Sequence, residues 1–382
     1  MRFWPFRGRR PAAPPPPPDL VVTEDLLRRS VEDLLLVREL EIRGGIFSFR
    51  GDLLVAPARA LDVLLERLRP FGYTPFLRAS REGVVVQAWP LAETVERPRV
   101  LVNVVLFLAT CASTLVAGSM FSGSPTFDAF RTFSGPAWFL SGIPFAGTLL
   151  AILGVHEFGH YFTARHYRAQ VSLPYFIPAP PPLFLFGTMG AIIRMRSPAR
   201  DRNSLFDIAA AGPLAGLAVA LPAVILGLHW STVMPVPPGG HIVFGDSLLM
   251  RLLVSWRFGA IPEGAMLFTH PIADAAWAGF LVTALNLFPV GQLDGGRIAY
   301  ALVGRHHKAL GIATVIALVA MGVLTWSPNW FVWAGLVYFL IGLHHSPPLD
   351  DLTPLSRGRR VVGLACLILL VLLVPPIPIQ IG

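Results

Sequence analysis

The sequence predicts a polytopic α-helical membrane protein with about seven transmembrane helices, a re-entrant β-hairpin and a small cytosolic α+β domain. Of its 382 residues, 54% are hydrophobic and only 14% are charged, and the mean hydropathy is +0.60. A helix that crosses a bilayer needs about 20 mostly apolar residues. Segments of that kind lie near residues 100–118, 137–161, 204–228, 275–303, 309–326, 329–343 and 361–381.

The chain before residue 97 carries no apolar span and is expected to lie outside the membrane. Residues 1–19 form a basic, proline-rich arm that lacks the apolar core of a cleavable signal peptide, and this arm is expected to be flexible. Residues 20–96 are expected to fold as a soluble α+β domain, because helical and strand-like patterns alternate along them. The predicted elements are a helix over 22–40 capped by Thr23, a strand over 45–54, a helix over 57–72, and a hairpin formed by 74–80 and 82–90.

The transmembrane domain, residues 97–382, is interrupted between its second and third spans by an apolar stretch dense in proline and glycine, residues 171–204. Proline prevents an ordinary helix there, and the runs 174–180 and 187–195 have strand character. Irregular backbone at membrane depth is tolerated only where protein or a water-filled cavity satisfies its polar groups. We therefore expect a re-entrant β-hairpin in preference to an ordinary cytosolic loop.

The net charge of +8 indicates membrane orientation rather than a nucleic-acid partner. Basic residues gather before the first span and in alternate connections, for example at Arg165 and Arg305. The other connections hold only Arg131, Arg251 and Arg257. The positive-inside rule places the N-terminus in the cytosol and, with about seven spans, the C-terminus outside. No nucleic-acid binding is expected, because the basic residues flank spans instead of forming one patch.

The second predicted span contains the most informative motif, His156-Glu157-Phe158-Gly159-His160. On a helix, His156 and His160 share one face, so both imidazoles can reach one metal ion. Glu157 is rotated about 100° from His156 and can hold a water molecule without being a ligand. A chance match is the alternative for so short a motif. The flanking residues are otherwise uncharged, and ionisable residues inside a span mark functional sites by default, so a metal site is favoured.

Asp294 is the expected third ligand, because a catalytic zinc site usually has three protein ligands and one position for water. Counting about 1.5 Å per residue from the nearest basic residue, His156 lies roughly 13 Å deep, His160 roughly 8 Å and Asp294 roughly 16 Å. Pro289 and nearby glycines are expected to break this fourth span. Asn286, on the same segment, is expected to donate to a developing oxyanion. The alternative for Asn286 is a hydrogen bond between helices.

Three motifs, in this order, resemble the site-2 protease family of intramembrane zinc metalloproteases: HEFGH at 156–160, AAAGPLAG at 209–216 and NLFPVGQLDGG at 286–296. The resemblance covers roughly residues 100–345 and is nearest to bacterial relatives of the chloroplast EGY-type branch, to which residues 20–96 are also similar. It implies hydrolysis of peptide bonds in transmembrane protein substrates, within or near the lipid bilayer. It also implies residence in a bacterial inner membrane.

By this resemblance, His156, His160 and Asp294 bind Zn2+, Glu157 is the catalytic base and Asn286 assists. A substrate helix must unwind before it is cleaved, and the predicted hairpin is expected to bind the extended segment by strand pairing. Ile192 is expected to supply a main-chain donor. The full set of expected substrate-binding residues is Gly187, Thr188, Met189, Gly190 and Ile192.

Two alternative functions stay open at this point. A catalytically silent scaffold of the same fold would be expected to lack a motif residue, and none is missing. A metal or ion transporter would be expected to show internal repeats and polar residues spread along one path. The ionisable residues of the predicted spans instead concentrate at one level, which favours the protease. The oligomeric state is not indicated by any sequence pattern.

Overall fold

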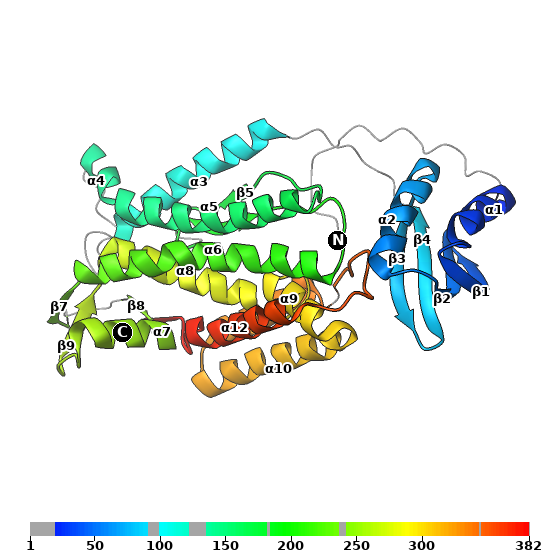
Figure 1. Ribbon diagram of the computed structural model, residues 1–382. Helices are drawn as coiled ribbons and strands as arrows, with labels where there is room; N and C mark the ends of the chain where they lie inside the picture. The colour runs from blue at the N-terminus through cyan, green and yellow to red at the C-terminus, as the bar shows by residue number, and fades with distance from the viewer. Residues whose placement is uncertain are drawn as a thin grey trace. The chain divides into compact units, whose positions relative to one another are not determined.

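The computed structural model describes residues 20–90, 99–121, 135–181, 184–236, 242–343 and 345–381 (Figure 1). By its internal contacts the chain divides into two compact units. The smaller unit comprises Met1–Arg97 and Pro348–Thr353, and the larger unit comprises Pro98–Pro347 and Pro354–Gly382.

The smaller unit contains a four-stranded antiparallel sheet and two helices. Its elements are α1 (Leu20–Val31), β1 (Leu35–Arg43), β2 (Ile46–Leu53), α2 (Pro57–Leu68), β3 (Tyr73–Ser80) and β4 (Gly83–Pro90). The strand order is β1-β2-β4-β3, and Phe47, Phe49 and Leu61 are fully buried in its core. A distant segment adds to the β3 edge, where the Leu77 N–H donates to the Leu349 carbonyl at 2.7 Å.

The strand, second helix and hairpin predicted for this unit are confirmed, but the helix predicted over 22–40 is wrong in its second half. α1 ends at Val31, and β1 begins at Leu35. Gly44 and Gly45 have φ values of +57° and +81°, and this tight turn pairs β1 with β2. Strand pairing thus overrides the helical spacing. Thr23 is buried inside α1 and is not its cap.

The larger unit is mostly helical, with short strand pairs at its connections. Its helices are α3 (Val100–Phe121), α4 (Pro136–Ser141), α5 (Ile143–His166), α6 (Arg202–His229), α7 (Leu248–Phe258), α8 (Pro271–Leu287), α9 (Asp294–Val303), α10 (His307–Thr325), α11 (Pro328–Gly335), which a π-helical turn Leu336–Ile341 continues, and α12 (Arg357–Leu373). Its antiparallel strand pairs are β5 (Tyr175–Pro178) with β6 (Thr188–Ile192), β7 (Thr232–Pro235) with β9 (Ala265–Phe268), and β8 (Ile242–Phe244) with β10 (Ile379–Ile381).

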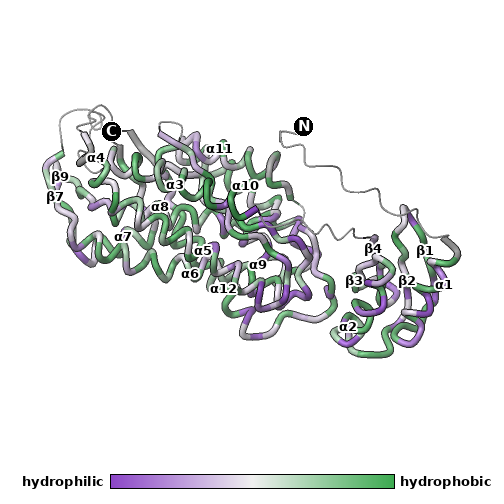
Figure 2. Tube along the Cα trace, turned by 90° about the horizontal axis from the view of Figure 1, so that it is seen from above, coloured by the Kyte–Doolittle hydropathy of each residue, from purple (hydrophilic) through white to green (hydrophobic). Residues whose placement is uncertain are grey.

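Long apolar helices make this chain a membrane protein. Within the described residues, three helical stretches are long and apolar enough to cross a bilayer: Val100–Met120, Arg202–His229 and Asp294–Thr325. The last of these contains both α9 and α10, and the apolar helix Pro271–Leu287 is shorter. Hydrophobic residues run along the helices of this unit in Figure 2. α5 has 24 residues, but the HEFGH motif interrupts its apolar sequence.

The span predicted over 275–303 is broken, as its proline and glycines indicate. α8 ends at Leu287 and α9 begins at Asp294. Gly291 has a φ of +54°, a left-handed conformation that glycine adopts without strain. A Cβ at Gly295 would lie 1.9 Å from the Leu287 carbonyl oxygen, so the chain turns back closely on the end of α8. As a result, Asp294 is the first residue of a new helix.

α6 is the central helix of the larger unit and packs against α5, α8 and α9 (Figure 1). It begins with a capping box, in which the Asp201 side chain accepts from the Ser204 N–H and the Ser204 side chain accepts in return. Buried small residues such as Ala209, Ala210 and Ala220 line its interior faces. Small residues let helix backbones approach closely. α5, which carries HEFGH, and α9, which carries Asp294, therefore both pack directly against α6.

Candidate metal centre

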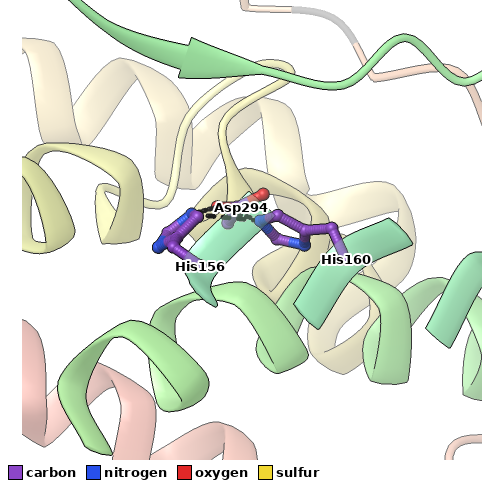
Figure 3. Close-up of side chains that lie close together, drawn as sticks. All are labelled: His156, His160 and Asp294. Atoms are coloured by element: carbon purple, nitrogen blue, oxygen red, sulfur yellow. Dashed lines mark hydrogen bonds and ion pairs between the residues drawn. The ribbon is translucent and has the colours of Figure 1, made fainter. Parts of the chain in front are cut away.

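α5 places two histidines and a glutamate in the interior of the helical unit. His156 and His160 are each 3% exposed, and Glu157 is 5% exposed. The Nε2 atoms of the two histidines lie 3.1 Å apart (Figure 3). This is the juxtaposition that the four-residue spacing predicts, since such residues share one face of a helix.

Asp294 joins the histidines from the first turn of α9 (Figure 3). Its Oδ2 lies 3.1 Å from His160 Nε2 and 3.4 Å from His156 Nε2. Ligand atoms about 2.1 Å from a tetrahedral zinc ion are about 3.4 Å from one another. The three atoms are therefore spaced like three corners of one coordination shell. Among the residues described, this is the one group of at least three histidine, cysteine or carboxylate ligands that could hold a metal ion.

The backbone of α6 orients His160. Its Nδ1 lies 2.6 Å from the Ile208 carbonyl oxygen, so the Nδ1–H donates to that carbonyl. The lone pair on Nε2 is then left for the metal, on the side of His156 and Asp294. A hydrogen bond of this kind fixes the ring and raises its basicity as a ligand.

Two glycines of α6 make room for the histidine rings. A Cβ at Gly212 would lie 2.1 Å from His160 Nε2, and a Cβ at Gly216 would lie 3.2 Å from the Cβ of His156. Because the glycines are four residues apart, they form a groove on one face of α6. Their spacing is a sequence signal for close helix packing, but it does not reveal which side chains occupy the groove. Both glycines are absent from the predicted site for that reason.

We expect Gly212→Ala to lower the metal affinity of the purified protein by about 10- to 100-fold, the usual effect of disturbing a residue that supports a metal ligand. The added methyl group would overlap His160 Nε2 and displace the ring. Metal content per chain after dialysis measures the effect. The control is Gly147→Ala in α5, where a Cβ would meet no atom within 4 Å. Equal metal content in the two variants would contradict the proposed fit.

Glu157 lies between the metal ligands and the hairpin. The backbone N–H of Ile193, directly after β6, donates to its carboxylate, and the carboxylate also interacts electrostatically with His160 and Asp294. A carboxylate that is close to a metal site without belonging to its ligand set is placed to accept a proton there.

The β5–β6 hairpin leaves two of its predicted substrate-binding residues accessible along the strand. Met189 is 59% exposed and Ile192 is 55% exposed. Gly190 is buried, and its φ of +99° is a backbone conformation that favours glycine. Met189 thus lies between the buried residues Thr188 and Gly190, as expected where one face of a strand is covered.

The other two predicted residues shape the turn. The Thr188 hydroxyl is buried and donates to the Ile177 carbonyl at 2.8 Å. Gly187 packs against α3, where Ser113 Oγ donates to its carbonyl at 2.6 Å. A Cβ at Gly187 would lie 2.4 Å from the Ser113 carbonyl oxygen. Glycine is therefore required at position 187 for contact with α3.

Successive main-chain N–H groups of β6 point alternately toward β5 and away from it. The Arg194 N–H donates to Ser172 Oγ on the β5 side. With a period of two residues, the Ile192 N–H also faces the β5 side, whereas the N–H groups of Ala191 and Ile193 face the opposite edge. Within the described chain, no further strand pairs on that edge. Ala191 therefore offers an outward-facing N–H on that edge, the Ile193 N–H serves Glu157, and the donor role of Ile192 stays a prediction.

Asn286 lies in the last turn of α8 and is half-buried. Its side chain makes no hydrogen bond to another residue of the described ranges. The helix–helix hydrogen bond considered as the alternative is thus not formed within the described chain. A role for Asn286 at a developing oxyanion stays a prediction.

Comparison with known proteins gives one family and a consistent set of relatives. Residues 144–326 match Peptidase family M50. A probable zinc metalloprotease EGY2, chloroplastic, from Oryza sativa subsp. indica is 31% identical over 350 residues, which cover 88% of this chain and 62% of the relative. A probable zinc metalloprotease EGY1, chloroplastic, from Arabidopsis thaliana is 33% identical over 245 residues, 62% of this chain and 43% of the relative. No solved structure matches the chain.

The chain thus spans 62% or less of the length of these relatives. Zinc is the metal in the names of the relatives, and the buried group of His156, His160 and Asp294 is compatible with zinc. Two imidazoles and a carboxylate leave one tetrahedral position open, which is typical of catalytic rather than structural zinc sites.

Proposed function

Because its segment 144–326 matches Peptidase family M50, we propose that this chain is an intramembrane zinc metalloendopeptidase that cleaves transmembrane protein substrates. The observation that carries the proposal is the buried group of His156, His160 and Asp294 with Glu157 beside it, inside an apolar helical unit. The direct test is cleavage of a single-span protein in reconstituted vesicles, with and without a zinc chelator. Full cleavage in the presence of the chelator would contradict the proposal.

His156, His160 and Asp294 are the proposed metal ligands, Glu157 the proposed base and Asn286 the proposed oxyanion donor. Bound zinc supplies Lewis acidity at the scissile carbonyl and toward the attacking water. Glu157 takes a proton from that water and delivers it to the leaving amine. The Asn286 amide donates to the carbonyl oxygen as negative charge develops on it.

We also propose that the β5–β6 hairpin is re-entrant and binds the unwound substrate as an added strand, through Gly187, Thr188, Met189, Gly190 and Ile192. The packing of its turn supports re-entrance. The Phe186 ring lies 6.5 Å from the Phe145 ring and 6.0 Å from the Trp277 ring, between ring centroids. The turn of the hairpin thus lies near the first turn of α5, which contains Phe145. The base of the hairpin, closed by the bridge between Val171 and Met195, follows the last turn of the same helix in the chain. The hairpin therefore extends along most of α5.

If the outer edge of β6 binds substrate, Ala191→Pro should lower cleavage by about tenfold or more, because it removes one main-chain donor from that edge. Proline is tolerated on edge strands where the N–H faces outward, so zinc content and melting temperature should be unchanged. Ala191→Gly, which keeps the N–H, is the control. Normal cleavage by a folded Ala191→Pro protein would mean that this edge does not pair with substrate.

The proposed topology has about seven spans, with residues 20–96 as a separate domain on the cytosolic side and the C-terminus outside. The proposed membrane is a bacterial inner membrane. α12 ends at Leu373, earlier than the span predicted over 361–381, and the chain beyond it forms β10. β10 pairs with β8, which belongs to the connection between α6 and α8. This pairing supports placing the C-terminus on the same side as that connection.

Cysteine labelling in intact cells is expected to report opposite sides for the two ends of the chain. Ser80, exposed in the smaller unit, would be replaced by cysteine in one protein, and a cysteine would be added after Gly382 in another. Cys111 and Cys366 would be serine in both. An impermeant reagent should label the C-terminal cysteine before lysis and the residue-80 cysteine only after lysis. Labelling of both before lysis would contradict the proposed topology.

A further inference from the structure

Arg297 lies one turn beyond Asp294 on α9 and faces the base of the hairpin. Residues three apart share a helix face, so its side chain leaves α9 on the side of the metal ligand. Its Nη1 lies 3.8 Å from Met195 Sδ, and a thioether sulfur is a weak acceptor. Met195 forms the bridge with Val171 at the hairpin base. The guanidinium of Arg297 is half-buried between these two parts of the proposed active site.

The guanidinium of Arg297 has no ion-pair partner in the part of the chain that the structure describes. Its electrostatic partners are Glu157, the proposed base, and the imidazole of His345. His345 in turn faces His307, with 5.9 Å between ring centroids, and each ring has a buried nitrogen without a hydrogen-bond partner in the described chain. Apart from the Glu157 carboxylate, the groups found here around Arg297 carry no negative charge.

A partly buried guanidinium without an anion is costly, and a carboxylate is the group that its planar fork binds best. Glu157 is an unsuitable permanent partner, because a base locked in an ion pair could not accept a proton readily. The substrate is the remaining source of an anion. The other candidate role, stabilisation of the Glu157 charge alone, would affect every substrate equally.

The direction of α9 indicates which side of the substrate meets Arg297. From Asp294, α9 runs to Gly304, whose backbone approaches the Arg202 side chain at the start of α6. The start of α6 is its cytosolic end in the proposed topology. Arg297 is therefore about 4.5 Å nearer the cytosol than Asp294 along the helix. An extended peptide advances about 3.3 Å per residue. The guanidinium can therefore reach substrate residues within about three positions of the scissile bond on that side.

We propose that Arg297 binds an aspartate or glutamate side chain of the substrate, within about three residues of the scissile bond on its cytosolic side, and so selects the cleavage position. This specificity role rests on the proposed protease function. Arg297 would be a substrate-contacting residue that is neither a metal ligand nor the base.

The test uses purified full-length protein and single-span substrates whose cytosolic-side residues are changed one at a time to Asp, Asn or Lys. The enzyme variants are Arg297→Gln and Arg297→Glu, with Arg305→Gln as the control, because Arg305 is exposed in the turn after α9. Cleavage sites are assigned by mass spectrometry, and zinc content is measured for each protein. Substrate affinity is measured separately in the Glu157→Gln background, where it does not depend on turnover.

At one position, the unmodified enzyme should prefer Asp over Asn by about tenfold or more in kcat/KM, the ratio expected for a charge-assisted hydrogen bond. Arg297→Gln should remove that preference, Arg297→Glu should shift it toward Lys, and Arg305→Gln should leave it unchanged. An equal loss with all substrates in Arg297→Gln, or no preference at any position, would overturn the proposal. If Glu157-dependent cleavage is absent, the protease function fails, and the affinity ratios still decide the role of Arg297.

Discussion

Glu157→Gln is expected to lower peptide cleavage by about 10²-fold or more while zinc remains bound, the usual scale for loss of an acid–base group. Glutamine keeps the size of the side chain and can still accept the Ile193 N–H through its carbonyl oxygen. It cannot take a proton from water. Because Glu157 is outside the group of three close ligand atoms, the metal site should be intact. Turnover and zinc content would be measured on the same preparation.

The control for this prediction is Glu263→Gln, at an exposed glutamate in the connection before β9. It makes the same chemical change far along the chain from the HEFGH motif and should cleave at the normal rate. Unchanged turnover in Glu157→Gln would reject its role as base. Loss of zinc together with turnover would instead indicate that Glu157 is a ligand or is needed to hold the ligands in place.

Removing the three proposed ligands together should abolish both zinc binding and activity. The triple variant His156→Ala, His160→Ala, Asp294→Ala is expected to fall from about one zinc per chain to almost none, because no donors remain in the shell. Asp294→Asn alone should weaken binding strongly, since it removes the anionic ligand and keeps the shape. Elemental analysis after dialysis gives the stoichiometry, and phenanthroline should inactivate the unmodified enzyme.

His229→Ala is the matched control for the ligand variants, because His229 is exposed at the end of α6. It should retain its zinc and its activity. A triple variant that kept one tightly bound zinc would place the metal elsewhere, and the assignment of all three ligands would then be wrong.

The elements that the sequence predicts best are those fixed by local geometry. Two histidines four residues apart must share a helix face, so His156 and His160 could be paired without any knowledge of the fold. Asp294 required one further step, a count of depth along two spans of the same orientation. That count succeeded although α8 and α9 are separate helices, because the break precedes Asp294 and leaves its distance to the cytosolic end unchanged.

What the sequence did not reveal depends on contacts between distant segments. Gly212 and Gly216 support the histidines only because α6 packs against that face of α5. The segment that forms β1 was predicted as helix, because the spacing of its apolar residues is compatible with a helix and with a strand. Its pairing with β2 determines that it is a strand. The direction of the N–H groups in β6 follows from the register with the chain around Ser172, which residue types alone do not specify.

The segment Pro348–Thr353 has a practical consequence for anyone who shortens this protein. It lies between α11 and α12 in the sequence, yet it belongs to the smaller unit, where Leu349 is buried in the hydrophobic core and bonds the β3 backbone. A truncated chain that starts after residue 97 would therefore keep this segment without the sheet that it bonds, and would expose Leu349 to water. Conversely, a protease cut between Pro90 and Arg99 would leave two fragments that stay associated, so loss of the covalent link would not by itself remove the N-terminal unit.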